Sequence, residues 1–474
     1  MIAHTAFSQL NITDYPSYPE YERIMQRFQT NNQSLCRIIN IGKTINGRNL
    51  LFAKISRNVD TREKEPILMY SSSIHGNETT GYALMLKLID YLLNNYNQDS
   101  LITDLINNTE IWINPLANPD GTYRYDTIIS NPSRENLNGY DLNRNFPSPD
   151  PVMGNHPDDD PRWEPETQAF MSLAMKYNFT LSVNFHTGSE VVNYPWDYKA
   201  SLHPDDSWYH YISKQYADTV HKYSSDYMTD LDNGITNGYQ WYQIFGGFQD
   251  YMNYFAHSRD VTIELSHDFD PPYIDINNYW EYNYRSMLNY IKQTHYGIKG
   301  TITDSLTGKP LKAIITVLNH DTLNTDIYSD SINGYYHRMI YKGKYDLLYY
   351  CAGYHPKIVR NIIALNNSAT TVNVQLSDTS GKVSTSIYNI PQPVYYYSAN
   401  SREIKYINPQ FRKVTVKLYN LLGTELSTIF NSSISEGSYS FRIPDNLPSG
   451  IYLCNLMIDG RNYTMKIPVL SQTY

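Results

Sequence analysis

The stretch Ser73-Ile-His-Gly-Asn-Glu-Thr79 lies between an apolar run and a segment with helical spacing. The run, from Glu65 to Tyr70, is short, ends in serines and predicts a buried strand. The segment from Thr80 to Leu93 repeats apolar residues at helical spacing. A buried strand, a loop and a helix in this order are typical of an α/β fold. The sequence therefore places His75 and Glu78 on a loop that leads from a strand into a helix.

The same alternation of strands and helices continues to about residue 290. Further strands are predicted at Glu110–Pro115, Phe179–Phe185 and Val261–Leu265. A helix is predicted to begin at Pro165, because proline at the first helical turn loses no hydrogen bond. We therefore predict an α/β domain with a mixed, largely parallel sheet and helices on both faces.

The pattern changes near Tyr296, and two small all-β sandwich domains are predicted to follow. Residues 297–376 are short β-branched segments separated by turns, including an Asn-Gly pair. Residues 377–391 are rich in Ser, Thr and Pro and predict a linker. Residues 392–474 form a second all-β unit. The predicted domains are therefore 1–296, 297–376 and 392–474.

Length and composition limit the class of protein. The chain has 474 residues, which is too long for one ordinary core. With 38 Lys and Arg against 47 Asp and Glu, its net charge is -9. This balance excludes a global basic surface for nucleic acid but leaves a local patch open. No stretch is apolar for long enough to span a bilayer. Three distant cysteines do not make a disulfide framework, so stability comes from packing.

The first thirty residues lack the charged and then apolar pattern of a signal peptide. Either a signal is missing from this sequence or the protein is cytoplasmic.

A metal site is the first functional hypothesis. His75 and Glu78 are joined by His186, which comes about a hundred residues later at the end of a predicted strand. Two imidazoles and one carboxylate form the ligand set of an open catalytic zinc site. In α/β sheets, ligands gather beyond the carboxyl ends of the strands, where these residues are expected. Taken alone, the His-x-x-Glu spacing also fits a hydrogen bond at a helix start.

The motifs around these residues carry a resemblance. In chain order they are His75-Gly-Asn-Glu78, Asn118-Pro-Asp-Gly121, Arg134-Glu-Asn-Leu-Asn-Gly-Tyr-Asp-Leu-Asn-Arg-Asn-Phe-Pro147, Pro165-Glu-Thr167, Asn184-Phe-His186, Asn193-Tyr-Pro-Trp-Asp197, Asn237-Gly-Tyr-Gln-Trp-Tyr242, Gly246-Gly-Phe-Gln-Asp250 and Thr262-Ile-Glu264-Leu-Ser266. Together they resemble the zinc metallocarboxypeptidases, specifically the regulatory subfamily that includes carboxypeptidases N, E, D and M. The resemblance covers roughly residues 15–295.

The resemblance implies roles for the residues that perform the reaction. One zinc ion would be bound by His75, Glu78 and His186, with one position left for water. Glu264 would be the general base, and Arg134 would stabilise the oxyanion. The alternatives are a salt-bridged or edge-strand glutamate and a surface arginine.

The resemblance also implies how substrate is held. Asn143 and Arg144 match the pair that binds the terminal carboxylate, and Tyr242 matches the tyrosine that closes over the substrate. Asp197 and Gln249 match pocket residues for a C-terminal Lys or Arg, the natural partner of a buried carboxylate. The alternatives are a structural salt bridge for Arg144 and a turn cap for Asp197.

Some residues depart from the resemblance or lie outside it. Trp196 stands where relatives often have Phe or Tyr, which could alter the pocket shape. The acidic stretches His156–Asp160 and His203–Asp206 could bind calcium, but we interpret them as solvated loops. His267, close to Glu264, is interpreted as structural.

The trailing domains carry weaker resemblances. Residues 297–376 are similar to the transthyretin-like sandwich that follows the catalytic domain in this subfamily. Residues from about 392 resemble the C-terminal sorting domain of the type IX secretion pathway of some Gram-negative bacteria. The alternative for the tail is an extra sandwich for adhesion or stability. The resemblance implies a secreted or cell-surface protein, associated with the bacterial outer membrane. An N-terminal signal lost by truncation would reconcile this with the first thirty residues.

The sequence therefore predicts a zinc-dependent metallocarboxypeptidase that prefers C-terminal Lys or Arg. Its expected partners are peptide or protein C-termini and, through the tail, secretion and surface-anchoring machinery; neither nucleic acid nor a transmembrane segment is expected. A non-catalytic peptide-binding homologue and a carboxypeptidase for peptidoglycan stem peptides are the alternatives.

Overall fold

The computed structural model describes residues 12–150, 163–351 and 353–378, and most of 394–469 in seven segments. Those segments are 394–398, 402–408, 412–420, 424–435, 437–448, 450–458 and 461–469. The chain divides into two compact units. The first comprises residues 1–351 and 355–377, and the second comprises residues 352–354 and 378–474. The predicted linker, residues 377–391, lies almost wholly outside the described residues.

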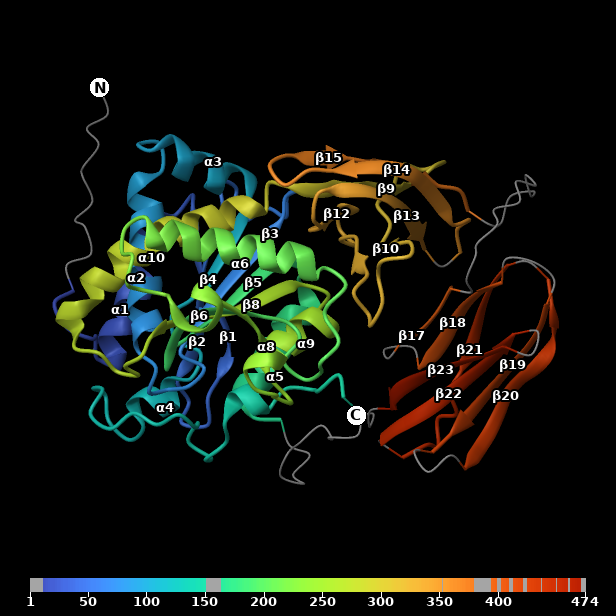
Figure 1. Ribbon diagram of the computed structural model, residues 1–474, viewed down its shortest axis with the longest axis horizontal. Helices are drawn as coiled ribbons and strands as arrows, with labels where there is room; N and C mark the ends of the chain where they lie inside the picture. Colours follow the sequence, from blue (N-terminus) through green and yellow to red (C-terminus); the bar gives the residue numbers. More distant parts are fainter. Residues whose placement is uncertain are drawn as a thin grey trace. The chain divides into compact units, whose positions relative to one another are not determined.

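One eight-stranded sheet forms the centre of the first unit (Figure 1). In sheet order its strands are β1 (Cys36–Lys43), β2 (Asn49–Ile55), β4 (Glu110–Asn114), β3 (Ile67–Ser72), β5 (Phe179–His186), β8 (Arg259–Ser266), β6 (Ser189–Tyr194) and β7 (Ile235–Asn237). The four central strands β4, β3, β5 and β8 are parallel, whereas β1, β2 and β6 add antiparallel pairs. The prediction of a mixed, largely parallel sheet is confirmed.

Helices cover both faces of this sheet (Figure 1). The helical elements are α1 (Tyr18–Asn31), α2 (Thr80–Asn95), α3 (Ser100–Asn108), α4 (Pro119–Tyr123), η1 (Leu142–Arg144), α5 (Pro165–Lys176), α6 (Asp206–His221), α7 (Asp230–Asn233), α8 (Gly238–Trp241), α9 (Phe248–Tyr254), η2 (Tyr273–Asp275) and α10 (Ile276–Gln293). Side chains of a strand alternate between faces. Leu68 and Tyr70 therefore pack with α1, α2, α6 and α10, whereas Ile67 and Met69 pack with α5 and α9.

The loop after β3 is shaped by close contact with the Asn-Pro-Asp-Gly turn. The backbone N–H of Asn118 donates to the carbonyl of Ser73 (3.0 Å), and its side-chain amide donates to the carbonyl of Ile74 (3.1 Å). A Cβ on Gly76 would lie 2.3 Å from the carbonyl carbon of Gly121. Only glycine allows this approach, so the two motifs form one folded element.

A β-sandwich follows the α/β domain within the first unit (Figure 1). One sheet has the order β11 (Ile327–Tyr328), β10 (Ile314–Val317), β13 (Gly343–Tyr350) and β14 (Lys357–Ala364). The other has β12 (Tyr335–Arg338), β9 (Gly297–Asp304) and β15 (Ala369–Thr371), and β16 (Val374–Leu376) also pairs with β9. Gly334 has a φ of +73°, as the predicted Asn-Gly turn requires.

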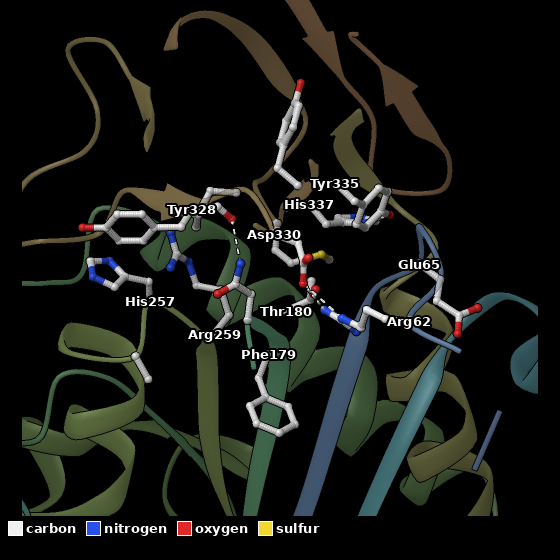
Figure 2. Close-up of a pocket in the computed structure, with 15 residues that line it drawn as sticks. Arg62, Glu65, Phe179, Thr180, His257, Arg259, Tyr328, Asp330, Tyr335 and His337 are labelled. Atoms are coloured by element: carbon white, nitrogen blue, oxygen red, sulfur yellow. Dashed lines mark hydrogen bonds and ion pairs between the residues drawn. The ribbon is translucent and has the colours of Figure 1, made fainter. Parts of the chain in front are cut away.

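Ion pairs connect this sandwich to the α/β domain. Figure 2 shows Arg62, which precedes β3, donating from Nε and Nη2 to one oxygen of Asp330 (3.0 and 2.9 Å). A second connection corrects a prediction. The segment His203–Asp206 is not a solvated loop, because His203 and Asp205 are each only 2% exposed. Asp205 is buried because it pairs with Arg259 and with Arg338 of the sandwich.

The second unit is a β-sandwich with its own core. Its strands are β17 (Val394–Ser398), β18 (Glu403–Asn408), β19 (Arg412–Tyr419), β20 (Glu425–Ile434), β21 (Gly437–Arg442), β22 (Gly450–Ile458) and β23 (Arg461–Val469). They form the sheets β17-β18-β21 and β20-β19-β22-β23. Residues of both sheets, such as Ile404 and Val416, share one apolar cluster. None of the helices in the described part of the chain has the length and apolar character that crossing a bilayer requires.

Candidate active site

Three segments meet at the carboxyl edge of the central sheet. Parallel pairing of β5 with β8 aligns His186 with Glu264. Parallel pairing of β3 with β5 aligns Ser72 with Phe185, so the loop that carries His75 and Glu78 begins directly beside His186. This edge is where α/β sheets place their ligands.

The side chains of His75, Glu78 and His186 converge on one point. Glu78 lies between the imidazoles: Oε1 is 2.7 Å from His75 Nδ1, and Oε2 is 2.9 Å from His186 Nδ1. The two Nδ1 atoms are 3.1 Å apart. Among the described residues, this is the one group of three His, Cys, Asp or Glu side chains whose donor atoms gather in this way.

The outer nitrogen of each imidazole has its own partner. His75 Nε2 lies 3.0 Å from Asp141 Oδ1, and His186 Nε2 lies 2.8 Å from the side-chain amide of Asn184. The carboxylate accepts the Nε2–H of His75, and a flip of the Asn184 side-chain amide would let its oxygen accept the Nε2–H of His186 in the same way. Both Nδ1 lone pairs then face the common point, which is the arrangement that orients histidines toward a metal.

The charge of Glu78 fits the same interpretation. The side chain is 2% exposed, and burial by itself would raise its pKa. His75 and His186 outweigh burial and lower the pKa of Glu78 below its ordinary range. The donor set is therefore one carboxylate and two imidazoles, which suits zinc.

A pocket opens beside these donors, and several predicted site residues line it. Its lining includes Arg134, Asn143, Asp197, Tyr242 and Glu264. Arg144 and Gln249 are not among the lining residues. The structure thus brings together at this pocket most of the residues singled out in the sequence.

Glu264 is a buried carboxyl group that faces this pocket. Within the described part of the chain, its Oε2 has no hydrogen-bond partner. Burial, with the neighbouring Glu78 and Asp197, raises the pKa of Glu264 well above its ordinary value, and Arg134 opposes the shift. Such an unpartnered buried carboxyl group is suited to exchanging a proton with a bound molecule.

Cationic and amide groups also lie at this site. Arg134 Nε donates to Asp141 Oδ2 (3.0 Å), and its Nη1 is 3.6 Å from Glu78 Oε1. Asn143 Oδ1 accepts the backbone N–H of Phe248 (2.9 Å), which leaves its NH₂ group available. Arg144 Nη1 donates to the carbonyl of Asn143 (2.9 Å).

Asp197 is 3% exposed and sits in a nearly closed cradle. Its Oδ1 accepts from Gln249 Nε2 (2.8 Å) and from Asn193 Nδ2 (3.1 Å). A Cβ on Gly238 would lie 1.7 Å from the same oxygen, so only glycine fits there. Burial raises the pKa of Asp197 to about 6, although the Asn193 hydrogen bond and Arg144 oppose it. Gln249 is thus placed to orient Asp197 and does not line the pocket itself.

Sequence reasoning gave no role to Asp141 and Asn184. Asp141 connects His75, Arg134 and the backbone N–H of Asn143. A signal for Asn184 was present, because residues two apart in a strand point to the same face. No local pattern signals Asp141, which lies 66 positions from His75.

Two further candidates from the sequence are His267 and the acidic stretch His156–Asp160. His267 bonds to Asp230 (2.9 Å) and lies 3.4 Å from Glu190, outside the donor group. The stretch His156–Asp160 lies outside the described residues.

Comparisons with known proteins find similar carboxypeptidases. A family model described as zinc carboxypeptidase matches residues 21–286. Human carboxypeptidase D is 34% identical over 76% of this chain and 26% of its own length. Mouse carboxypeptidase M is 35% identical over 68% of this chain and 75% of its own length. A crystal structure of carboxypeptidase A from Helicoverpa armigera is 22% identical, covers 58% of this chain and 73% of that chain, and has a TM-score of 0.49.

The chain belongs to the zinc carboxypeptidase family. It spans 26% of the length of carboxypeptidase D. The family uses a catalytic zinc ion, and the donor group of His75, Glu78 and His186 fits that ion.

The contact of Asp141 with His75 generates a prediction about metal affinity. Replacing Asp141→Asn should lower zinc affinity by about tenfold to a hundredfold, because the carboxylate orients His75 and raises its basicity. Competition with a zinc chelator measures the effect. Asp226→Asn, at an exposed position, is the control. Equal zinc affinity in the two variants would contradict this role of Asp141.

Proposed function

We propose that this protein is a zinc metallocarboxypeptidase that hydrolyses the C-terminal peptide bond of peptides and proteins and prefers C-terminal Lys or Arg. The observation that carries the proposal is that one pocket contains a zinc-type donor group, a buried carboxyl group beside it and a second carboxylate, Asp197, farther in. Family membership supports the reaction class.

Zinc would be held by His75, Glu78 and His186, where it would polarise the peptide carbonyl and acidify a water molecule. Glu264 is the general base. It lies beside His186 in the sheet, takes the proton of the attacking water and passes it to the leaving amine.

Arg134 stabilises the negative charge that develops on the carbonyl oxygen. Its guanidinium borders the pocket and is fixed by Asp141, so it is positioned before the charge appears. A preorganised donor of this kind contributes on the order of 3 kcal/mol to the transition state.

The terminal carboxylate of the substrate is bound by Asn143 and Arg144 and covered by Tyr242. The amide of Asn143 faces the pocket, and Tyr242, 45% exposed, lies at its rim. Arg144 donates from Nη1 to the carbonyl of Asn143, and its guanidinium would form two parallel hydrogen bonds with the carboxylate.

Asp197 selects the last side chain of the substrate. One of its oxygens accepts from Gln249 and Asn193, and the other has no hydrogen bond recorded within the described residues. A buried carboxylate is stabilised by a cation, so Lys or Arg is its natural partner.

Outside the α/β domain, we propose that residues 297–376 form a transthyretin-like β-sandwich. We propose that residues 392–474 serve in sorting and anchoring. The strands of both segments, and the apolar cluster of the second segment, support β-sandwich modules. The resemblance of the tail to type IX sorting domains supports export and a secreted or outer-membrane location.

Replacing Glu264→Gln tests the catalytic proposal. Turnover should fall by at least about a hundredfold, because proton transfer by a positioned base contributes about 10²–10⁴ to the rate. Zinc content, measured on the same sample, should stay at the wild-type level.

The substrates for this test are blocked dipeptides ending in Arg, Lys, Phe or Glu, with and without a chelator. Zinc-bound protein that cleaves none of them would favour a non-catalytic peptide-binding homologue, and cleavage of stem peptides alone would favour a peptidoglycan enzyme. Full activity of the Gln variant would remove Glu264 from the mechanism.

The pKa of Asp197 predicts a pH-dependent specificity. Burial raises this pKa to about 6, so the carboxylate is charged above that pH and becomes neutral as the pH falls below it. The ratio of kcat/KM for Arg over Phe peptides should therefore decline by about tenfold between pH 8 and pH 5, because about a tenth of the carboxyl groups stay ionised one pH unit below the pKa. In Asp197→Asn the ratio should be low at every pH from about 5 to 8. A wild-type ratio that does not change with pH would contradict this role.

The proposed tail function predicts processing in the native host. The form recovered from the cell surface should lack residues 392–474, with cleavage within residues 377–391. Intact mass determination on surface and soluble fractions checks this. Full-length protein confined to the cell interior would overturn the sorting role and leave the catalytic proposal untouched.

A further inference from the structure

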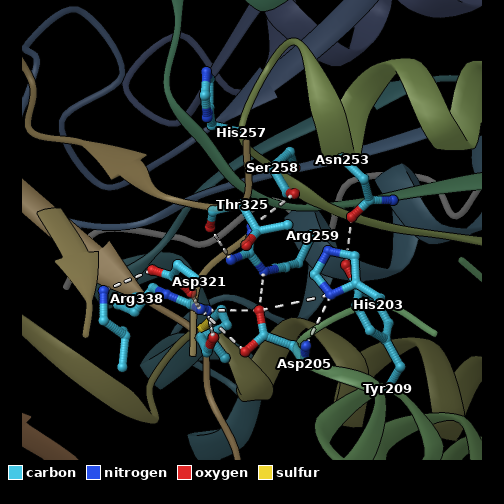
Figure 3. A network of polar contacts seen from close by, with 12 residues as sticks. His203, Asp205, Tyr209, Asn253, His257, Ser258, Arg259, Asp321, Thr325 and Arg338 are labelled. Atoms are coloured by element: carbon cyan, nitrogen blue, oxygen red, sulfur yellow. Dashed lines mark hydrogen bonds and ion pairs between the residues drawn. The ribbon is translucent and has the colours of Figure 1, made fainter. Parts of the chain in front are cut away.

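Figure 3 shows a buried carboxylate, Asp205, at the contact between the α/β domain and the first β-sandwich. Arg259, at the start of β8, donates from Nε to Asp205 Oδ2 (2.8 Å). Arg338, from β12 of the sandwich, donates from Nη1 to Oδ2 (2.8 Å) and from Nη2 to Oδ1 (3.1 Å). His320 of the sandwich donates from Nε2 to Oδ1 (2.8 Å). The sandwich thus supplies two of the three side chains that bind this carboxylate.

The charges in this cluster compensate one another. Arg338 is completely buried and also bonds to Asp321, so two guanidinium groups face two carboxylates. Burial would raise the pKa of Asp205, but Arg338 and Arg259 outweigh it and hold the pKa well below its ordinary value. A buried pair of this kind is strongly destabilised when one partner is lost. The position of Asp205 therefore depends on the sandwich.

One route from Asp205 leads to the specificity pocket through a contact between two rings. The backbone N–H of Asp205 donates to His203 Nδ1 (2.9 Å). The ring of His203 packs on the indole of Trp196, with centroids 4.7 Å apart and an interplanar angle of 40°. Trp196 is fully buried and immediately precedes Asp197. A shift of His203 would therefore move the backbone that carries Asp197.

A second route runs through side-chain hydrogen bonds. His203 also packs on Tyr209 of α6, with centroids 5.0 Å apart. The hydroxyl of Tyr209 donates to Asn253 Oδ1, and Asn253 Nδ2 donates to the carbonyl of Gln249 (2.9 Å). Gln249 in turn donates to Asp197 (2.8 Å). Both routes from Asp205 thus end at the same carboxylate.

We propose that the first β-sandwich helps to determine substrate specificity: Arg338, acting through Asp205 and His203, is a positioning residue for Asp197. This inference rests on the proposed function, because Asp197 is the residue proposed to bind the basic side chain of the substrate. The sandwich thus takes part in substrate recognition, although its residues lie far along the chain from the catalytic residues.

Arg338→Lys tests the proposal, because it keeps the charge and removes the two-point grip on Asp205. The ratio of kcat/KM for Arg-ending over Phe-ending peptides should fall about tenfold, since small misplacements at a site are costly. The fall should come from a higher KM for the Arg peptide, while kcat for the Phe peptide stays within about twofold.

Arg62→Lys is the matched control. Arg62 also joins the α/β domain to the sandwich, through Asp330. Within the described residues, neither Arg62 nor Asp330 forms a hydrogen bond or ring contact with His203 or Trp196. This variant should leave the ratio within about twofold of wild type. Equal changes in both variants, or an equal loss for all peptides, would reduce Arg338 to a purely structural role and overturn the proposal.

A second pair of variants keeps the test decisive if Arg338→Lys does not fold. Tyr209→Phe removes one hydroxyl from the second route and should lower the same ratio about threefold. Tyr216→Phe removes a comparable buried hydroxyl from the same helix, one that bonds to Asn283 (3.0 Å), and should not change the ratio.

An unchanged ratio in Tyr209→Phe, with the wild-type preference intact, would overturn the inference alone. A wild-type enzyme with no preference for basic residues would overturn the proposed specificity as well.

Discussion

The parallel pairing of β3, β5 and β8 is the constraint on which the candidate site depends. It aligns His186 with Glu264 and starts the His75 loop beside them, although these residues are far apart in the chain. Parallel strands end at a common edge of the sheet, so the loops that follow them lie close together. The closeness of Gly76 to Gly121 then fixes the loop. The backbone geometry of the sheet and the loop therefore fixes where the three donor side chains lie.

Charge compensation distinguishes two structural carboxylates from two carboxyl groups that line the pocket. Asp141 and Asp205 are both surrounded by donors, and each holds a part of the fold in place. Glu264 and Asp197 are buried with fewer partners, and both line the pocket. An unpaired buried carboxyl group is costly, so these two are left able to pair with a bound molecule. Among these four residues, the two structural carboxylates thus have more partners than the two that line the pocket.

Local patterns predicted the elements well where a segment was strongly apolar. The predicted strands near residues 67, 110, 179 and 261, and the helix start at Pro165, match β3, β4, β5, β8 and α5. They did not predict that His203–Asp206 is buried. The reason is that the partners of Asp205 lie 54 and 133 positions away, and an isolated acidic run looks solvated. Gln249 was singled out as a pocket residue, and in the fold it donates a hydrogen bond to Asp197 of the pocket lining.

By itself the sequence determined the alternation of strands and helices, the residues able to ligate zinc and the family to which the chain belongs. It could do so because hydrophobic period, ligand chemistry and motif order are properties of residues close together in the chain. Only the tertiary structure decided that Asp141 contacts His75, that Gln249 donates to Asp197, and that a sandwich residue reaches Asp205. These are contacts between distant segments, and their geometry exists only after the sheet has brought those segments together.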